Sequence, residues 1–481
     1  MNVALIDLDR RHHLFKVPLW WPVYLPSVAA VLRESGHAVA LIERGVLEAR
    51  SHDNADEVLR RLVARVVSAE PELVLFDVRA DSASDLNAFA EAARRGAPRA
   101  RLLAGGRHPT LCPDETLEDC GFLDGIVAGE AENAMSRLAA GAALDAVPSV
   151  VFRQAGQAAR TAGEAPVTDL DTLPLPAWDL LDMRYYARRT PRAIPCFPLK
   201  TATLETSRGC PGQCTFCSEG RMNSKAHRFH GAAYVAEAIQ LLIRDYGIDG
   251  AYFCDESFLA NPGRVMQLCE ELMRQGLDRK IRWSAQVRTD SVNPEILAVL
   301  RKAGCVQLEY GVESGSQRML DSVAKGATME QNAAAVRLGR EAGVRALVYI
   351  MYGLPGETRD DLRETARFLG RTRPDIVRFI RFMPFPGTPA AQQLVAAGRL
   401  PRDFWREARG GRSFFEYTRE NVSAMPAEVL RTEARSVYFR RVFPVYLRDY
   451  LRRNSPADIL SHMQAAELLR FLREKMVAPR E

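Results

Sequence analysis

The chain has 481 residues, of which 47% are hydrophobic and 26% are charged, and its formal net charge is +5. These proportions are ordinary for folded globular proteins, so they exclude a disordered or fibrous chain, and the length suggests about three domains. The 65 Lys and Arg exceed the 60 Asp and Glu by too little to indicate nucleic-acid binding.

The sequence offers no sign of a membrane span or of a disulfide framework. No apolar run approaches the roughly 18 residues of a transmembrane helix, and the start MNVALIDLDRR lacks the order of a signal peptide. We therefore expect a cytoplasmic protein. Nine cysteines without regular spacing favour reduced thiols or metal ligation. Six of them are expected to be buried apolar residues, although one could be a catalytic thiol: Cys112, Cys120, Cys196, Cys254, Cys269 and Cys305.

Residues 1–150 alternate short apolar runs with helical patterns. The apolar runs predict strands at 3–9, 38–44, 72–78, 100–106 and 124–130, and the helical patterns predict helices at 26–35, 55–68 and 84–95. Such alternation is typical of a parallel sheet covered by helices, so we predict a Rossmann-like, doubly wound domain. Ligands of these sheets bind at the carboxyl ends of the strands, which directs attention to the loops after Asp77, Ala104 and Val127.

These three loops carry the candidate ligand-binding residues of the first domain: Ser82, Gly105, Gly106, Arg107, His108, Gly129 and Glu130. A pair of glycines at a strand end allows the backbone to approach a bulky ligand closely, although a tight turn without any ligand has the same composition. His108 could bind a metal, but a turn histidine hydrogen-bonded to the backbone is the favoured interpretation.

Residues 151–200 differ from what precedes them. Six prolines between Pro166 and Pro198 predict an extended linker with little helix, and Ala155 and Gly156 indicate a hairpin turn.

A cysteine motif follows at once, in the segment TSRGCPGQCTFCSEG. Cys210, Cys214 and Cys217 have C-x3-C-x2-C spacing, and three soft thiolates so close together indicate one metal centre. Structural zinc needs four ligands, and no second Cys or His pair follows at the spacing of a zinc knuckle, so zinc is the weaker interpretation. A 4Fe-4S cluster held by three cysteines keeps one iron free for a small molecule.

Strands and helices alternate again from residue 201 to 389. We predict strands at 203–206, 250–254, 282–287, 307–311, 345–352 and 376–382, which together make a partial (β/α)6 TIM barrel with its active site at the carboxyl ends of the strands. Residues 390–481 have helical patterns and an aromatic stripe that indicates core packing. A lid over the substrate is the second hypothesis for this region.

The SRGCPGQCTFC segment, with Phe216 before the last cysteine, resembles the radical S-adenosylmethionine (SAM) superfamily. This resemblance implies that the free iron chelates the amino and carboxylate groups of SAM, and that the reduced cluster generates a 5′-deoxyadenosyl radical. It also implies SAM contacts at the strand ends, from Phe216, Asp255, Glu256, Ser284, Arg288, Glu313, Ser314, Gly353 and Pro355. Chemically, carboxylates suit an ammonium group and arginine suits a carboxylate, whereas helix capping by Asp255 and an exposed Arg288 are the alternatives.

GGRHPT and GIVAGEAE resemble the N-terminal cobalamin-binding domain of the cobalamin-dependent branch of that superfamily. The resemblance implies cobalamin over the first sheet, facing the barrel, with contacts from the seven loop residues named above. The D-x-H-x-x-G pattern of a histidine ligand is absent, which argues against histidine ligation. Trp20 and Trp21 stand where relatives carry small residues, and they would either cover the lower face of the corrin or fill its pocket.

The resemblance implies a cobalamin-dependent radical SAM enzyme, and within that family we expect a methyltransferase that transfers methyl from methylcobalamin to a substrate carbon radical. The alternatives are a radical cyclase, oxidoreductase or rearrangement enzyme without methyl transfer, and a protein that binds SAM or cobalamin without turnover. A small-molecule substrate and an external electron donor of the flavodoxin or ferredoxin type are the expected partners, with no nucleic acid.

Overall fold

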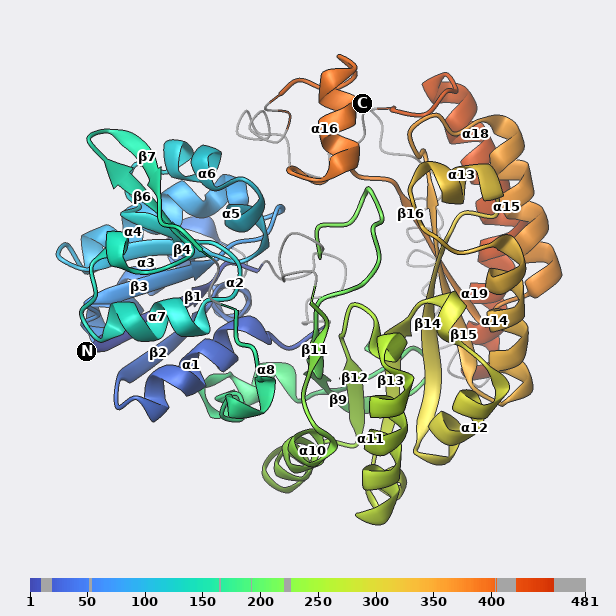
Figure 1. The fold of residues 1–481 in the computed structure, drawn as a ribbon, viewed down its shortest axis with the longest axis horizontal. Coiled ribbons are helices and arrows are strands. Elements are labelled where there is room, and N and C mark those ends of the chain that lie inside the picture. Colours follow the sequence, from blue (N-terminus) through green and yellow to red (C-terminus); the bar gives the residue numbers. More distant parts are fainter. Residues whose placement is uncertain are drawn as a thin grey trace.

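Two α/β units stand side by side in the computed structural model, which describes residues 1–9, 20–51, 54–163, 166–191, 193–219, 226–402, 404 and 421–453 (Figure 1). Within these residues, no helix is both long enough and apolar enough to cross a bilayer.

The first unit is a seven-stranded sheet in the order β2-β1-β3-β4-β5-β6-β7. Its strands are β1 (Asn2–Asp7), β2 (Ala38–Glu43), β3 (Leu73–Asp77), β4 (Arg101–Gly105), β5 (Gly125–Val127), β6 (Val150–Gln154) and β7 (Gln157–Arg160). β1 to β5 are parallel, as the sequence predicts. The Rossmann-like interpretation of this segment is confirmed.

Helices cover both faces of this sheet. The main ones are α1 (Tyr24–Glu34), α2 (Arg44–Arg50), α3 (Ala55–Ala69), α4 (Leu86–Gly96), α5 (Arg107–Leu111), α6 (Pro113–Asp119) and α7 (Glu132–Ala139). Successive residues of a strand pack in the cores on opposite faces of the sheet. Ala4 and Ile6 pack in the cluster that contains residues of α3 and α4, whereas Val3 and Leu5 pack in the cluster that contains residues of α1 and α7. A strand that is buried on both faces has no polar alternation, and this explains the continuous apolar runs.

The expected hairpin is present and belongs to the first sheet. Ala155 and Gly156 both have positive φ, as a two-residue hairpin turn requires. β6 pairs antiparallel with β5 and with β7. The expected boundary at residue 150 therefore falls inside this sheet, which extends to Arg160.

The proline-rich segment that follows contacts both units. It contains the short helices η3 (Leu170–Thr172), η4 (Trp178–Leu180) and α8 (Met183–Tyr186). Trp178, Tyr185 and Tyr186 are buried in the core of the second unit. The amide of Ala177 donates to the carbonyl of Pro26 at 3.0 Å in the first unit. The linker is thus a strap packed against both units.

The second unit is a curled sheet in the order β16-β15-β14-β13-β12-β9-β8. Its strands are β8 (Arg189–Thr190), β9 (Leu199–Leu204), β12 (Gly250–Phe253), β13 (Arg282–Val287), β14 (Cys305–Glu313), β15 (Arg345–Tyr352) and β16 (Ile376–Arg381). All neighbours except β8 and β9 are parallel. The predicted six parallel strands are confirmed as an open half-barrel.

Helices line the outer face of the half-barrel (Figure 1). They are α10 (Ala232–Tyr246), α11 (Pro262–Arg274), α12 (Pro294–Lys302), α13 (Gln317–Ser322), α14 (Met329–Glu341) and α15 (Arg359–Thr372). A small antiparallel pair, β10 (Ser207–Arg208) and β11 (Arg228–Phe229), brackets the cysteine segment.

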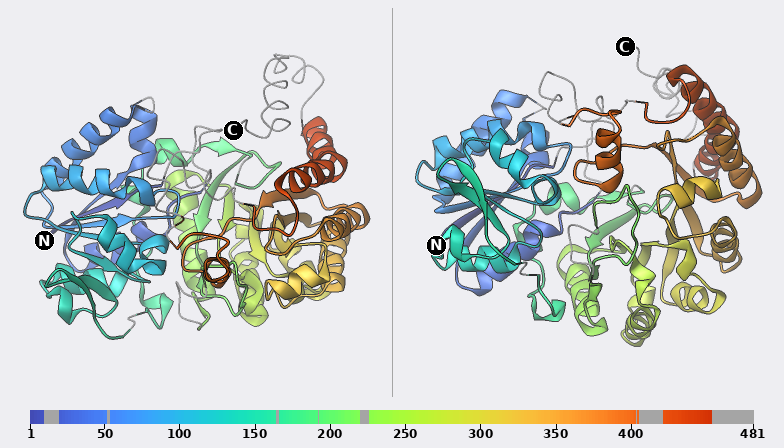
Figure 2. Two further views of the ribbon diagram at one scale, coloured as in Figure 1. Left: turned by 90° about the horizontal axis from the view of Figure 1, so that it is seen from above. Right: turned by 45° about the horizontal axis from the view of Figure 1, so that its top comes forward.

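The last described helices divide between the mouth and the edge of the barrel (Figure 2). α18 (Ala427–Val437), a π-helical turn at Tyr438–Val442 and α19 (Phe443–Arg453) pack on α15 and β16, and the Tyr446 hydroxyl donates to the Val377 carbonyl at 2.7 Å. α16 (Pro389–Ala396) lies beside the cysteine loop instead, where the Ala390 amide donates to the Thr215 carbonyl at 2.9 Å. Trp405, Phe414, Phe415 and Tyr417, which belong to the expected aromatic stripe, lie outside the described residues.

Candidate active site

One buried carboxylate fixes the start of the cysteine loop. Asp255, which follows β12, is fully buried and accepts hydrogen bonds from the Thr206 amide (2.6 Å), the Thr206 hydroxyl (2.6 Å) and the Ser207 hydroxyl (2.9 Å). A carboxylate oxygen that already accepts such bonds in an enclosed position has little capacity left for a ligand. Asp255, expected to contact SAM, is therefore placed to anchor the loop.

The three motif cysteines are half-buried on this loop. Cys210 and Cys214 converge on Gly212, because a Cβ at that position would lie 3.3 Å from one Sγ and 3.8 Å from the other. No group of three His, Cys, Asp or Glu among the described residues is arranged to hold a single metal ion. A cube differs from a single ion in that each thiolate binds a different iron, so this donor set fits a 4Fe-4S cluster better than zinc.

Two cations lie close to these thiols. A Cβ on Gly212 would be 3.1 Å from Nη1 of Arg288, whose Nη2 donates to the Lys325 carbonyl at 2.9 Å. Burial raises the pKa of the Cys214 thiol, while Lys325 acts in the opposite direction. Burial likewise raises the pKa of Cys217 to about 12. Without a bound metal both thiols are protonated, so cluster binding must release protons.

Glu313 and Lys325 form a buried pair at the end of β14. The Lys325 ammonium donates to Glu313 at 2.8 Å, and both side chains are at most 10% exposed. Glu313 has φ of +65°, a conformation that costs free energy for a residue with a side chain. Burial alone would lower the pKa of Lys325, but the charge of Glu313, the nearby Cys214 and the hydrogen bond with Glu313 together raise it. Glu313, which was expected to contact SAM, thus lies near Cys214 and forms an ion pair with Lys325.

Glu256 faces two charged groups near the third cysteine. Arg107, from α5 of the first unit, forms an ion pair with Glu219 and lies 3.9 Å from Glu256. Burial, and then the charge of Glu219, raise the pKa of Glu256 well above its usual value. One of its carboxylate oxygens is buried without a hydrogen-bond partner among the described residues. Glu256 is therefore the carboxylate of the Asp255–Glu256 pair that can receive an ammonium ligand.

The remaining residues that were expected to contact SAM differ in whether their polar groups already have a hydrogen-bond partner within the described protein. Ser284 is fully buried, and its hydroxyl has no hydrogen-bond partner in the described structure. The Ser314 hydroxyl, by contrast, accepts from the Ser316 amide at 3.2 Å and serves its own turn. The Gly353 amide donates to Glu357 at 2.6 Å. Pro355 is half-buried in the same loop. Phe216 packs at the edge of a separate apolar cluster formed by residues of α13 and α16.

The glycine pair after β4 has an internal explanation. Gly106 has φ of +90°, and a Cβ there would overlap Oδ1 of Asp77 at the end of β3. A Cβ on Gly105 would lie 2.9 Å from the Tyr24 hydroxyl. The backbone conformation of Gly106 and its close approach to Asp77 thus favour glycine without any ligand, and Gly105 is closely packed against Tyr24 of α1. They remain at the carboxyl edge of the sheet, where the sequence predicts the corrin.

Other residues that were predicted to contact the corrin also form hydrogen bonds or ion pairs within the protein. Ser82 is buried, and its hydroxyl accepts from the Arg79 amide at 3.0 Å. The Gly129 amide donates to the Thr110 hydroxyl at 2.8 Å. Glu130 forms ion pairs with Arg208 and Arg228 of the second unit. Of the seven residues, Arg107 is the one with a half-exposed charged side chain at this edge.

His108 is buried, and burial lowers its pKa to about 4. An unfolded histidine titrates near pH 6.5, so between these values the unfolded chain binds a proton that the folded chain does not, and stability falls as the pH falls. At pH 5 we expect a cost of about 2 kcal/mol relative to pH 7.5. Urea unfolding at both pH values should show this loss, and His108→Gln should reduce it. An equal pH dependence in the two proteins would contradict the prediction.

The two tryptophans contact the barrel. Trp20 stacks on Tyr252 of β12 with ring centroids 4.1 Å apart. Trp21 is buried beside Tyr186 and Tyr246, and its amide donates to the Thr203 hydroxyl at 2.9 Å. Trp21 is thus part of the barrel core, while Trp20 lies on the inner face of the barrel.

Sequence analysis missed several charged residues of this region. Glu219, Lys325 and Arg208 were not singled out, although Glu219 and Arg208 flank the cysteines in the motif itself. Lys325 gives no local signal, because it follows α13 and its partner Glu313 lies 12 residues earlier, at the end of β14.

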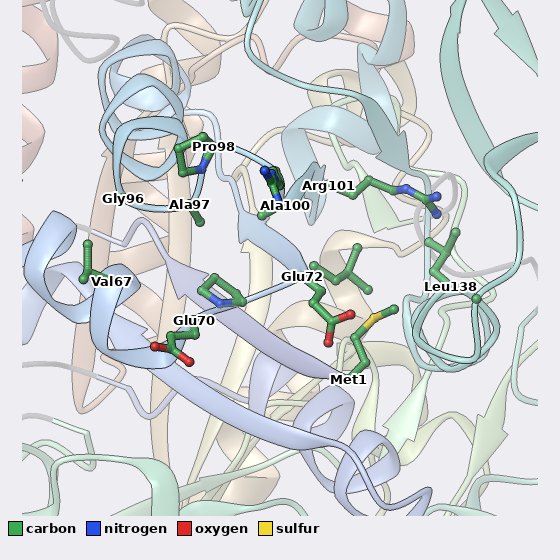
Figure 3. A pocket seen from close by; sticks show the side chains of 14 residues that line it. Met1, Val67, Glu70, Glu72, Gly96, Ala97, Pro98, Ala100, Arg101 and Leu138 are labelled. Atoms are coloured by element: carbon green, nitrogen blue, oxygen red, sulfur yellow. The ribbon is translucent and has the colours of Figure 1, made fainter.

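A large surface cavity lies elsewhere, at the amino ends of the first sheet. It has a volume of about 730 Å³ and is lined by residues that include Met1, Glu72 and Arg101 (Figure 3). Ligands of parallel sheets bind at the opposite edge. We therefore assign this cavity no part in the chemistry.

Comparisons with known proteins agree with this architecture. Residues 204–369 match the family model of the radical SAM superfamily, and residues 18–139 match that of the B12 binding domain. An uncharacterized methyltransferase, PH0819, of Pyrococcus horikoshii is 27% identical over 80% of this chain and 81% of its own length. The anaerobic magnesium-protoporphyrin IX monomethyl ester cyclase of Cereibacter sphaeroides is 27% identical over 78% of this chain, and the match spans 60% of the cyclase.

Among solved structures, the radical SAM methyltransferase TsrM of Kitasatospora setae has the same fold, with a TM-score of 0.67 and 19% identity over 82% of this chain and 76% of that one. The facing sheets and the three-cysteine loop define a two-domain enzyme with a cluster-binding half-barrel. The chain thus combines a radical SAM domain with a B12-binding domain. These two domains imply a 4Fe-4S cluster, SAM and cobalamin as cofactors.

Proposed function

We propose that the protein is a cobalamin-dependent radical SAM methyltransferase that acts on a carbon atom of a small molecule. The observation that carries this proposal is the contact of Arg107, at the carboxyl edge of the first sheet, with Glu219, two residues after the last motif cysteine. The two cofactor domains therefore face each other across their ligand-binding edges. When bound, the cluster and SAM supply a carbon-centred radical, and cobalamin supplies a transferable methyl group.

We propose specific duties for the residues of the barrel. Cys210, Cys214 and Cys217 hold the cluster. Glu256 has a buried oxygen without a hydrogen-bond partner among the described residues, which can accept from the SAM ammonium, and the Ser284 hydroxyl has none there either and can bind SAM. Arg288 lies within reach of the methionine carboxylate, because its guanidinium is next to Gly212 of the cysteine loop.

Apolar packing shields one side of the half-buried cysteine loop from water. Phe216 packs against the cluster of Met319, Leu354, Phe382 and Leu394, and the Thr215 amide donates to the Val323 carbonyl at 3.0 Å. Radical chemistry needs such exclusion, because open water and oxygen would intercept reactive intermediates.

On the first domain, we propose that cobalamin binds at the edge formed by the loops after β3, β4 and β5. Arg107 and Arg79 are partly exposed there, with side chains 52% and 41% accessible. The domain division that we propose is 1–160 for cobalamin, 161–200 for the strap, 201–389 for the barrel and 390–481 for the C-terminal region.

The proposal includes an external one-electron donor, because a 4Fe-4S cluster must be reduced before it can cleave SAM. A flavodoxin or ferredoxin in the cytoplasm meets this requirement. Neither the near-neutral charge nor the fold supports a nucleic-acid partner.

The test is turnover of anaerobically reconstituted protein with SAM whose methyl group is deuterated. We expect 5′-deoxyadenosine, together with a product from a metabolite extract that has gained the labelled methyl group. Heat-inactivated protein is the control. Release of 5′-deoxyadenosine with no labelled product in any extract would contradict methyl transfer.

The cyclase relative favours one alternative, a radical reaction that closes a ring without methyl transfer. The same experiment separates the two reactions, because ring closure leaves the deuterated methyl group out of the product.

A further inference from the structure

A second group of polar side chains lies on the inner face of the half-barrel, midway along its strands. Its members are Tyr252 of β12, Gln286 of β13, Gln307 and Glu309 of β14, Tyr349 of β15 and Arg378 of β16. Glu309 precedes Glu313 by four residues on the same strand, so it lies roughly 13 Å below the mouth of the barrel at about 3.3 Å per residue. These residues are therefore separate from the cluster end.

Glu309 is the centre of this inner-face group. It is 2% exposed and accepts hydrogen bonds from the Tyr349 hydroxyl at 2.6 Å, from the Gln307 side-chain amide at 3.1 Å and, at 3.4 Å, from the Tyr252 hydroxyl. Gln286 donates to the Tyr252 hydroxyl at 2.7 Å. A carboxylate held from three directions has a fixed position in the barrel.

The group has hydrogen-bonding capacity that the described protein does not use. Gln307 is fully buried, yet its side-chain carbonyl oxygen has no hydrogen-bond partner among the described residues. A buried oxygen left unpaired costs roughly 1–3 kcal/mol. Burial also raises the pKa of Glu309, even though Arg378 and the neighbouring hydroxyls act in the opposite direction. Both observations indicate a missing hydrogen-bond donor next to β14.

The same face is lined with aromatic rings and is accessible from outside. Trp20 lies parallel to Tyr252, with an angle of 26° between the rings. Gln286, Tyr349 and Arg378 are half-buried, and Ile380 of β16 is 42% exposed although it lies on the inner side. Gln286, Tyr349 and Arg378 therefore form a partly open rim, and Gln307 and Glu309 are buried next to it.

We propose that this inner-face group is the polar end of the substrate site, and that the substrate presents a hydrogen-bond-donating amine or hydroxyl to Gln307 and Glu309, with an apolar or aromatic body beside Trp20 and Tyr252. This inference rests on the proposed function, since it names the class of substrate for that reaction. It disfavours a substrate whose only polar group at this end is a carboxylate or a phosphate, because the unpaired Gln307 oxygen needs a hydrogen-bond donor that such a group does not supply.

The test uses three probes that share one ring and differ in their polar group: 2-phenylethylamine, 2-phenylethanol and phenylacetate. Each is titrated calorimetrically into the reconstituted holoenzyme with SAM bound. We expect the amine or the alcohol to bind at least tenfold more tightly than phenylacetate. Glu309→Gln should weaken binding of the amine at least tenfold. Gln307→Leu should weaken binding of the preferred probe and serves as the second variant if Glu309→Gln does not fold.

Glu341→Gln is the matched control, because Glu341 is 58% exposed on the outer helix α14 and should leave every affinity unchanged. The proposal is overturned if phenylacetate binds as well as the other probes, if both inner-face variants retain wild-type affinity, or if neither the amine nor the alcohol binds. Release of 5′-deoxyadenosine by the same preparation reports separately on the proposed function, so that failure of one is distinguishable from failure of the other.

Discussion

Replacement of Cys214 by alanine is expected to eliminate bound iron and to lower SAM cleavage more than a thousandfold. The remaining two thiolates would leave two irons of the cube without protein ligands. Cys214 occupies the middle of the motif, and its sulfur is shielded by burial and lies close to Lys325 and Arg288. Cys269 of α11 and Cys305 of β14 cannot replace it, because both are buried in the apolar core.

The measurement is iron content and visible absorbance after anaerobic reconstitution, followed by assay of 5′-deoxyadenosine. Wild-type protein should contain about four irons per chain, as a 4Fe-4S cluster requires. Cys269→Ala is the matched control, since it removes a thiol of equal size from the core and should retain the cluster. Full iron content in Cys214→Ala, or zinc in place of iron in the wild-type protein, would contradict the cluster assignment.

The two sheets could be predicted from the sequence because their strands are buried on both faces. A strand such as Val3 to Ile6 contributes alternate residues to two different cores, so its sequence is a continuous apolar run with no polar break. The edge of the first sheet was harder to predict. β6 and β7 leave that regular pattern, because Arg153 and Gln154 face solvent, and their hairpin was assigned to the linker.

The candidate site could be predicted only as far as local motifs extend. The cysteines lie within eight residues of one another, so their spacing was informative without a structure. The choice between Asp255 and Glu256 as the residue that binds SAM could not be predicted from the motif. It depends on which carboxylate accepts a hydrogen bond from the Thr206 amide, and Thr206 lies about fifty residues earlier in the sequence. The partners of the ion pair Lys325–Glu313 are 12 residues apart in sequence, and Arg107 and Glu219 belong to different domains. Chain folding alone brings such partners together.

The second large effect is expected on the free energy of unfolding when Arg208 is replaced. Its guanidinium is 5% exposed and pairs with Glu205 (2.7 Å) on its own loop and with Glu130 (3.0 Å) and Glu132 (2.7 Å) of the first domain. Burial alone would raise the pKa of Glu132, but the charge and hydrogen bond of Arg208 outweigh it and leave the pKa lowered. Removal of this one cation would leave the buried Glu132 and the partly buried Glu205 without their ion-pair partner, whereas Glu130 would keep Arg228.

We therefore expect Arg208→Ala to lower the free energy of unfolding by about 3–5 kcal/mol, the usual cost of stranding a buried charge. Urea unfolding of the cofactor-free protein measures this loss without interference from the adjacent cluster. Arg33→Ala removes another ion pair between the first domain and the strap, but its partners are 45% and 56% exposed, so it should cost less than about 1 kcal/mol.

Glu132→Gln in the Arg208→Ala background should recover part of the lost stability, because a neutral amide needs no counter-charge while Ser27 still supplies its hydrogen bond of 2.7 Å. Equal stability of the single and double variants would show that lost packing causes the effect. Recovery would show that charge does. Arg208 stands two residues before Cys210. Recovery would therefore mean that this ion network also holds the cysteine loop against the cobalamin-binding domain. The strength of the network would then determine how rigidly the two cofactor sites face each other.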